Sequence, residues 1–345
     1  MSHQDRRSRL DSSSRGGRMG GIFKAVLLIV LGLLFAGWAA APGLAAAWPR
    51  IQAIVWISEW MWLIAMLPMA IGLVIIGIRT RIRRRGFAWI VAGVVPLAVV
   101  GAGSLKREWR PWPRATSGTS RIVFLCAQDP PKAHAGQVLD SIEACNPDLV
   151  IVVNPGWIAP TWRSRIADST STQPDGTKAW QIRWVNPIMV ASRHGNVSVR
   201  TIARSEGITI MRIGMTGEAA SDLGFSDIVA VDLPSDPLRS RADVLEQLAG
   251  LLETQRQEGN LRSDLLVGDF NTTPRTLGVE EAWAGHVDLF ALAGTGWGGT
   301  WPRETPMFRI DMALGPKELD ARSVSTFDPG WGGHRGLVVE VGTGD

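Results

Sequence analysis

The residues best suited to chemistry are Asp269 and Asn271, which follow an apolar run in the segment DLLVGDFNTTP at 264–274. Such a run predicts a buried strand, and residues two apart leave the same side of an extended backbone. A carboxylate at that position can orient an attacking water or bind a metal ion, and a nearby amide can donate to a phosphate oxygen. The alternative is a structural turn in which both side chains cap the local backbone.

A second pair, Asp311 and His334, lies nearer the C-terminus. Asp311 follows Arg309 and Ile310 in a predicted strand, and His334 lies in the glycine-rich segment GWGGHRG. A histidine held by a carboxylate keeps one tautomer and gains basicity, so it can stabilise developing negative charge. The alternatives are an ion pair between Asp311 and Arg309, and an exposed loop position for His334.

The elements that must position these residues alternate between strands and helices. Strands are expected at 121–127, 148–153, 187–191, 197–203, 207–213, 226–233, 264–268, 307–314 and 336–342. Helices are expected at 133–145, 238–257 (with Leu238 on its apolar face) and 276–283, and a polar surface loop at 161–180. This order predicts one layered α/β domain over 121–345, preceded by a linker at 104–120.

Several segments, in order and spacing, resemble the endonuclease/exonuclease/phosphatase superfamily of metal-dependent phosphoesterases. The resemblance covers about residues 121–342 and implies a four-layered α/β sandwich, with two mixed sheets between helices. The segments that carry it are RIVFLCA, DLVIVVNP, SDIVAVDLPSD, LLVGDFNTTP, TWP followed by RID, and GWGGHRGLVVEV.

The resemblance also implies a role for each candidate residue. Asp269 would orient or deprotonate the attacking water, and Asn271 would contact the scissile phosphate. His334 would stabilise charge on the phosphate, and Asp311 would orient His334. The implied cofactor is a divalent metal ion, Mg²⁺ or Mn²⁺. Phosphoryl transfer needs such a positioned nucleophile, together with donors for the non-bridging oxygens.

The sequence departs from the superfamily pattern at the positions that would bind the metal. Asn154 replaces a metal-binding Glu, Gly333 replaces an Asp, and Asp232 replaces a His. The usual Asn after the first strand has no clear equivalent, although Gln128 lies close to that position. A neutral amide is a weaker ligand for Mg²⁺ than a carboxylate. Asp129 and Asp232 are candidates to rebuild the site.

Two functions therefore stay open. The first, which the motif residues favour, is a membrane-anchored phosphoesterase with an altered metal site, acting on a phosphodiester or phosphomonoester. The second is a catalytically inactive pseudoenzyme that serves as an extracytoplasmic binding or scaffolding module. A third class, a membrane interaction protein whose helices carry the function, is supported only by the basic loop at 79–85 and the tryptophan-rich second span.

Three apolar runs at 22–42, 51–78 and 87–103 predict three transmembrane helices. The tryptophans of 48–59 also suit the membrane interface, which is an alternative for that segment. Basic clusters in the leader 1–21 and in the loop 79–85 put both on the cytoplasmic side by the positive-inside rule. The C-terminal domain is then extracytoplasmic.

Charge is divided unevenly along the chain. Residues 1–120 hold 16 Lys and Arg against 4 Asp and Glu, whereas residues 121–345 hold 20 against 28. The basic part suits anionic lipid headgroups of the bilayer. The acidic domain lacks the basic footprint of a nucleic-acid binder, so a phospholipid or a small phosphorylated molecule is the expected substrate and a long nucleic acid is not.

The two cysteines, Cys126 and Cys145, lie at the start of this domain. In an extracytoplasmic domain they could form a disulfide, and the alternative is two free, buried thiols. Their spacing is not that of a zinc site. Four tryptophans either line a cleft or pack in the core and its rim: Trp157, Trp297, Trp301 and Trp331.

Overall fold

The computed structural model describes residues 3–48, 52, 54, 57–80, 83–111, 119–168, 180–195, 197–217, 220, 223, 226–236, 238–261, 265–276, 279 and 285–342. For 3–20, 46, 83–85, 119 and 168 it describes the backbone only. The chain forms two compact units, one of Met1–Ala41 with Ile57–Leu105 and the other of Pro42–Trp56 with Lys106–Asp345.

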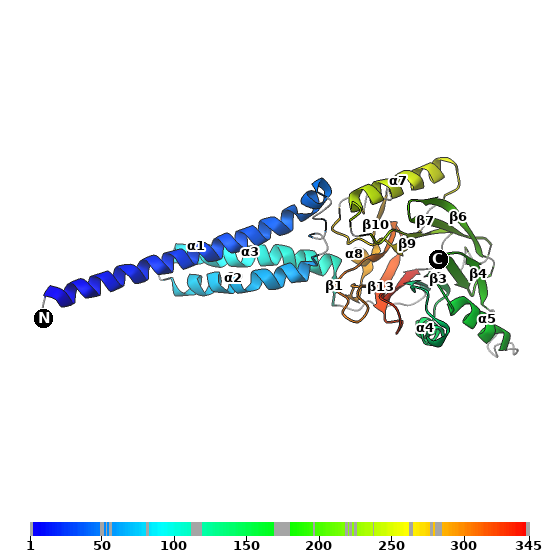
Figure 1. The fold of residues 1–345 in the computed structure, drawn as a ribbon, viewed down its shortest axis with the longest axis horizontal. Helices are drawn as coiled ribbons and strands as arrows, with labels where there is room; N and C mark the ends of the chain where they lie inside the picture. The colour runs from blue at the N-terminus through cyan, green and yellow to red at the C-terminus, as the bar shows by residue number, and fades with distance from the viewer. Residues whose placement is uncertain are drawn as a thin grey trace. The chain divides into compact units, whose positions relative to one another are not determined.

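Three helices build the first unit: α1 (His3–Ala47), α2 (Glu59–Arg79) and α3 (Arg83–Arg107), coloured blue to cyan in Figure 1. The segments Gly21–Ala45, Glu59–Arg79 and Gly86–Arg107 are long and apolar enough to cross a membrane. Large apolar side chains on them are exposed, as suits a lipid environment; Ile78 is 71% exposed. The three predicted helices are present, and the chain is a membrane protein by this criterion.

Two boundaries in this part differ from the predicted ones. α2 begins at Glu59 instead of residue 51, and an acidic residue in the first turn suits the positive end of the helix dipole. α3 continues to Arg107, so the start of the predicted linker is helical. α2 and α3 approach closely at Gly93, where an added Cβ would lie 2.8 Å from the carbonyl oxygen of Ala70. Small residues commonly permit such close contact between membrane helices.

The second unit contains two six-stranded sheets. The first has the order β13-β14-β2-β3-β5-β4, and the second has the order β10-β12-β9-β8-β7-β6. The first comprises β13 (Ala321–Phe327), β14 (Gly336–Gly342), β2 (Thr119–Cys126), β3 (Leu149–Val153), β5 (Ile188–Ser192) and β4 (Gln181–Val185). The second comprises β10 (His286–Asp288), β12 (Asp311–Pro316), β9 (Leu265–Asp269), β8 (Asp227–Asp232), β7 (Ile208–Met215) and β6 (Val197–Ser205). A short pair, β1 (Trp109–Arg110) and β11 (Gly296–Trp297), lies beside them.

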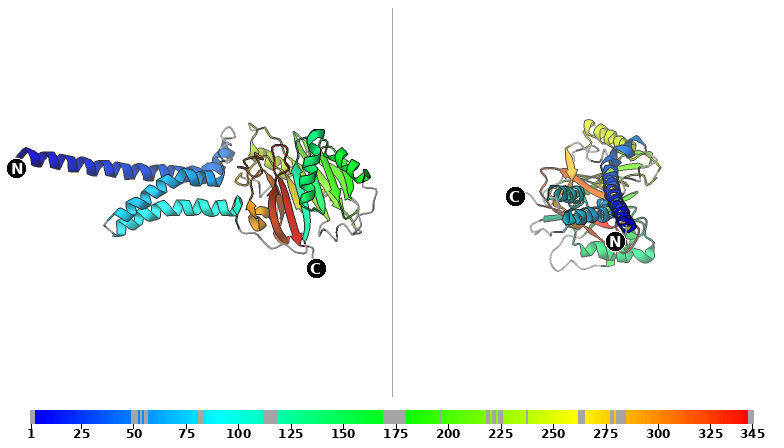
Figure 2. Two further views of the ribbon diagram at one scale, coloured as in Figure 1. Left: turned by 90° about the horizontal axis from the view of Figure 1, so that it is seen from below. Right: turned by 90° about the vertical axis from the view of Figure 1, so that its left-hand side faces the viewer.

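Helices cover the outer faces of both sheets. α7 (Arg241–Gln257) packs Val244 and Leu248 on the second sheet, and α4 (Lys132–Ala144) with α5 (Ile158–Asp168) covers the first. A third apolar cluster, which includes Phe124 and Val267, fills the space between the sheets. In Figure 1, α7 lies on one side of the strands and α4 and α5 on the other, and Figure 2 shows β13 and β14 side by side in orange and red. The predicted four-layered sandwich is confirmed.

Several local predictions were wrong or incomplete. α5 (Ile158–Asp168) overlaps the start of the predicted loop 161–180, because Ile158 and Trp162 bury against the first sheet. Residues 169–179 of that loop, and most of the predicted helix 276–283, lie outside the described residues. Leu238 is not on the apolar face of α7 but 80% exposed, because that helix begins after its cap Ser240, whose hydroxyl accepts from the Asp243 backbone N–H. The short strands β4, β10 and β13 were not predicted.

Candidate active site

The candidate site lies where the central strands of both sheets end. Each sheet has one parallel pair, β2 with β3 and β8 with β9, and the carboxyl ends of a parallel pair meet at the same edge. This edge of the two sheets opens into a pocket of about 520 Å³. The residues that line it are Cys126, Gln128, Asn154, Gly207, Asp232, Leu233, Pro234, Ser235, Asp269, Asn271, Trp301, Ile310 and His334.

Three aspartates stand in register across three neighbouring strands at this edge. Asp269 of β9 is opposite Asp232 of β8 on one side and opposite Asp311 of β12 on the other. Register partners carry their side chains on the same face, so the three carboxylates are crowded together. Gly268 permits the close approach of β8 and β9, because a Cβ at that position would lie 2.3 Å from Val231 Cγ2.

His334 precedes β14 and lies between two of these acids. Its Nδ1 is 2.9 Å from Asp311 Oδ2, and its Nε2 is 3.8 Å from Asp269 Oδ2. All three side chains are buried; those of His334 and Asp269 are each 4% exposed and that of Asp311 is fully buried. The second oxygen of Asp311, Oδ1, has no hydrogen-bond partner among the described residues. The structure thus brings together the acid, the histidine and the second acid that the motifs singled out.

The crowded carboxylates change the proton affinity of the whole group. Burial, followed by the nearby charge of Asp311, raises the pKa of Asp269 well above its usual range, although His334 opposes the shift. The same two causes raise the pKa of Asp232 to about 6. Burial by itself lowers the pKa of His334, but Asp311, Asp269 and Asp232 together raise it well above its usual value. The cluster therefore retains protons that isolated groups would lose near neutral pH.

Asn271 is held at the wall of the pocket by two hydrogen bonds. Its backbone N–H donates to Asp269 Oδ1 at 2.9 Å, and its side-chain amide donates to the Leu233 carbonyl at 2.8 Å. Its backbone is left-handed, with φ of 48°, a conformation that asparagine tolerates better than most residues. One amide hydrogen remains for a ligand, because an NH₂ group has two donors.

The residues at the departures from the superfamily pattern also lie at this edge. Asn154 and Asp232 both line the pocket, and the Asn154 amide partly offsets the rise in the pKa of Asp232. Gln128 Oε1 accepts from the Gly333 backbone N–H at 2.7 Å. Asp129 is exposed and does not line the pocket. Asp232 is thus the candidate replacement acid that the structure places beside Asp269.

Cys126 is the pocket residue that sequence reasoning missed. The thiol lies within 4.8 Å of an Asp269 carboxylate oxygen, and burial followed by the nearby acids raises its pKa well above the usual value. Both cysteines are free, and Cys145 lies at the C-terminal end of α4. The sequence feature that could have identified Cys126 is its place at the end of β2. This strand pairs in parallel with β3, which ends just before Asn154.

Two other expectations were settled by the packing. Arg309 pairs with Asp288, not with Asp311, through both guanidinium nitrogens, one of them 2.8 Å from Asp288 Oδ1. Of the four tryptophans considered for a cleft, Trp301 lines the described pocket. The others lie elsewhere: Trp331 stacks on His134 and Trp297 donates to the Pro306 carbonyl.

The donor set does not fit Mg²⁺ in the way that the resemblance implies. Mg²⁺ prefers near-octahedral oxygen ligands, above all carboxylates. Here a neutral amide, Asn154, stands where the resemblance implies a metal-binding Glu, and the Cys126 thiol lies near Asp269. The group of described residues whose donor atoms lie close enough to share one ion is Cys126, Asp269 and His334.

Comparison with known proteins gives matches among solved structures. A mannosyl-6-phosphatase from Bacteroides thetaiotaomicron is 10% identical, with a TM-score of 0.45, over 64% of this chain and 99% of that one. An endonuclease/exonuclease/phosphatase from Beutenbergia cavernae is 15% identical, with a TM-score of 0.45, over 66% of this chain and 72% of that one. A family member from Leptotrichia buccalis is 15% identical, with a TM-score of 0.44, over 64% and 99%.

No protein-family model matches the sequence, and no curated protein matches it. Two of the three solved structures carry the name of the superfamily that the sequence motifs resemble. At these identities the likeness concerns the fold alone, because one fold hosts many activities.

Proposed function

We propose that this chain is a membrane-anchored phosphoester hydrolase whose active site is the pocket at the ends of β2, β3, β8 and β9. The observation that carries the proposal is the chain of contacts from Asp311 through His334 to Asp269, beside Asn271 in an open pocket. Clustered titratable groups with perturbed pKa values in a cleft are typical of catalytic sites.

In the proposed reaction, Asp269 in its ionised form positions a water molecule and accepts its proton as the water oxygen attacks phosphorus. The bond from phosphorus to the leaving oxygen breaks, and that oxygen takes a proton from a solvent water. His334 is protonated near neutral pH, because its pKa is raised, and donates to a non-bridging oxygen. The remaining amide hydrogen of Asn271 donates to another. Donors fixed before the reaction stabilise the charge that develops in the transition state.

Asp311 would act on His334 and not on the substrate. Its hydrogen bond at 2.9 Å fixes the orientation of the imidazole ring and leaves Nε2 directed to the pocket side. No step in this scheme is assigned to Mg²⁺, since the donor set does not fit that ion.

The substrate class follows from volume and charge. A pocket of about 520 Å³ is in the range that holds small molecules. The acidic balance of residues 121–345 disfavours a long polyanion. We propose a phospholipid headgroup or a small phosphorylated metabolite, with the three helices anchoring the protein in the bilayer. The basic residues at 6–18 and 79–85 favour a cytoplasmic N-terminus and an extracytoplasmic catalytic unit.

The test is hydrolysis of a generic phosphodiester and a phosphomonoester by the full-length protein in detergent. Each reaction is run with Mg²⁺, with Mn²⁺ and with EDTA. Asp269→Ala and His334→Ala should both abolish turnover. His194→Ala is the matched control, because His194 also pairs with an aspartate, Asp148 at 3.0 Å, just before β3 and outside the pocket residues.

The second candidate function is a binding or scaffolding module without turnover. The replacement of the metal-binding Glu by Asn154, together with Gly333, favours it. If the wild-type protein unfolds cooperatively, and is therefore folded in the assay, absence of turnover under all three conditions would overturn the hydrolase proposal in favour of this one.

A further inference from the structure

We propose that Cys126, Asp269 and His334 form a three-ligand site for Zn²⁺ or another divalent ion that accepts thiolate. This site differs in ligand type from the oxygen-rich Mg²⁺ site implied by the sequence resemblance. The proposal does not depend on hydrolysis, because an ion can bind there in an active enzyme or in an inactive binding module.

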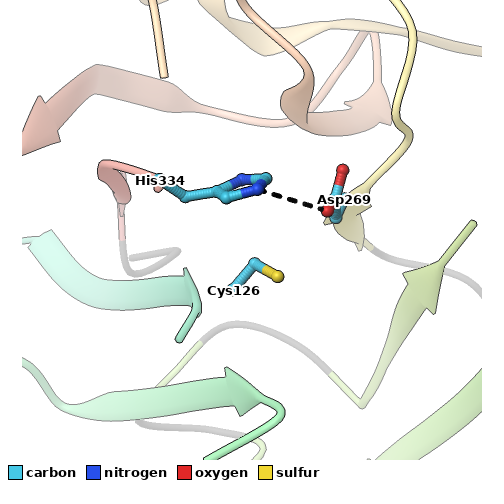
Figure 3. A group of neighbouring side chains, drawn as sticks. All are labelled: Cys126, Asp269 and His334. Atoms are coloured by element: carbon cyan, nitrogen blue, oxygen red, sulfur yellow. Dashed lines mark ion pairs between the residues drawn. The ribbon is translucent and has the colours of Figure 1, made fainter. Parts of the chain in front are cut away.

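The three donor atoms already lie close together. The Cys126 sulfur, an Asp269 oxygen and a His334 ring nitrogen are all within 4.8 Å of one another, and the nitrogen–oxygen distance is 3.8 Å. Donors on a tetrahedral zinc ion stand roughly 3.3–3.8 Å apart, given metal–ligand distances of about 2.0–2.3 Å. Small side-chain rotations are enough to complete the site. Figure 3 shows the three side chains ending in the same space.

The scaffold of the site is rigid. Cys126 is the last residue of β2 and Asp269 is the last residue of β9, so one ligand comes from each sheet. His334 comes two residues before β14, which pairs with β2. All three residues are buried. The two ligands that end strands of the packed sandwich, and the buried His334, lose little conformational entropy when an ion binds.

The hydrogen bond from His334 to Asp311 is an independent observation that points to a metal. An ionised carboxylate can only accept, so the 2.9 Å contact fixes a hydrogen on Nδ1 and leaves Nε2 as the atom that loses its proton and coordinates the ion. Metal-binding histidines almost always donate their second nitrogen to a carboxylate or a carbonyl in this way. The Nε2 atom faces Asp269, and the Cys126 sulfur lies within 4.8 Å of an oxygen of the same carboxylate.

The donor chemistry selects the kind of ion. One sulfur, one imidazole nitrogen and one carboxylate oxygen suit Zn²⁺, whereas Mg²⁺ takes oxygen ligands. A thiolate and a carboxylate together neutralise the two charges of the ion. Three protein ligands leave a fourth position, and all three line the open pocket, so water or a phosphate oxygen can reach it. Catalytic zinc sites commonly have three protein ligands and one open position.

Binding of this ion would change the roles of two residues in the proposed reaction. Asp269 and His334 would be ligands, and the water would be held at the fourth position beside Asn271. The metal-free scheme predicts that EDTA leaves turnover unchanged, whereas the zinc-bound scheme predicts that EDTA abolishes it. This difference separates the two schemes even though the same residues are essential in both.

The test is a titration of the full-length, chelator-stripped protein in detergent with Co²⁺, whose absorption reports its ligands. We expect one equivalent to bind with a thiolate-to-Co²⁺ charge-transfer band in the near ultraviolet and visible bands of tetrahedral intensity. One equivalent of Zn²⁺ should remove both, and excess Mg²⁺ should remove neither. Cys126→Ser should abolish the charge-transfer band, whereas Cys145→Ser, the matched control, should leave it unchanged.

Further variants separate ligation from structure. Asp311→Asn should keep the charge-transfer band but weaken Co²⁺ binding by about 10–100-fold, as the loss of a group that orients a ligand does. A wild-type protein that binds Co²⁺ without a charge-transfer band, or not at all, would falsify the proposal whatever the fate of the variants. A band that persists in Cys126→Ser would overturn it as well. The Co²⁺ titrations do not measure turnover. The metal-site proposal can therefore be tested even if the protein hydrolyses no phosphoester.

Discussion

Two buried charged groups lie close together in the sequence and differ in every other respect. Arg309 is bound by both oxygens of Asp288, donates to the Arg107 carbonyl, and lies over the Phe290 ring with its guanidinium carbon 4.9 Å from the centroid. Asp311, two residues later, shares His334 with Asp269 and keeps one oxygen without a partner among the described residues.

The comparison shows that buried charge is arranged favourably for stability at Arg309 and unfavourably at the pocket. The Arg309–Asp288 pair brings opposite charges together in bidentate geometry, the arrangement that best offsets the cost of burial. The group at the pocket brings three acids together around one histidine, which is electrostatically unfavourable without protons or a cation. Strain of this kind persists at functional sites because the surrounding fold holds it in place.

The largest effect that this comparison predicts is on activity. Asp269→Asn should lower turnover by about 10²–10⁴-fold, the usual contribution of a general base. It should leave the free energy of unfolding unchanged or higher, because the amide still accepts from Asn271 and the repulsion from two acids is relieved. The assay is phosphoester hydrolysis beside urea unfolding of the same full-length preparation. Turnover within a factor of three of the wild type would exclude the catalytic role.

The next effect is on stability. Asp288→Ala should destabilise the protein by about 3–5 kcal/mol, because it leaves the Arg309 guanidinium buried without its partner. The measurement is the urea midpoint, followed by tryptophan fluorescence. Asp328→Ala is the matched control: Asp328 pairs with Arg303 at 3.0 Å but is 46% exposed, so its loss should cost less than about 1 kcal/mol. If the two variants lost the same free energy of unfolding, the buried pair would contribute no more to stability than the exposed pair.

An intermediate effect is expected where β8 and β9, the strands that carry Asp232 and Asp269, lie side by side. Gly268→Ala should destabilise the protein by about 1–3 kcal/mol, because its Cβ would meet Val231 Cγ2 and the Val231 carbonyl oxygen. It should also lower turnover, since β8 and β9 must separate beside Asp232 and Asp269. Gly250→Ala is the control, because its Cβ would meet nothing within 4 Å. Unfolding midpoints and turnover are compared for the two variants.

The smallest effect is predicted for replacing the whole ion pair. Asp288→Leu combined with Arg309→Met should lie within about 1 kcal/mol of the wild type, because apolar residues of similar volume often replace a buried pair without loss. The double variant should therefore be more stable than Asp288→Ala in the same urea experiment. A double variant as unstable as the single one would mean that the contacts of Arg309 to Arg107 and Phe290 dominate.

The architecture and much of the pocket could be predicted from the sequence. Apolar strands separated by a helix predict the layers, and the motif residues Asp269, Asn271, Asp311 and His334 do converge. Local pattern carries this information because each residue lies at a strand end or in a short loop. Cys126 could not be identified, because its neighbours come from segments more than 140 positions away, and only the parallel pairing of β2 with β3 places it there. α5 was missed because its polar outer face hid the buried Trp162.

The backbone at Asn154 limits how this site can change over evolution. Its φ of 50° is a left-handed conformation, which asparagine adopts more easily than glutamate. A glutamate at this position would cost about 1–2 kcal/mol in backbone strain and would also replace the amide that lowers the pKa of Asp232 with another acid. A single substitution therefore meets an energetic barrier in both respects. An oxygen-only metal site that uses a glutamate at this position would therefore require at least one further, permissive change.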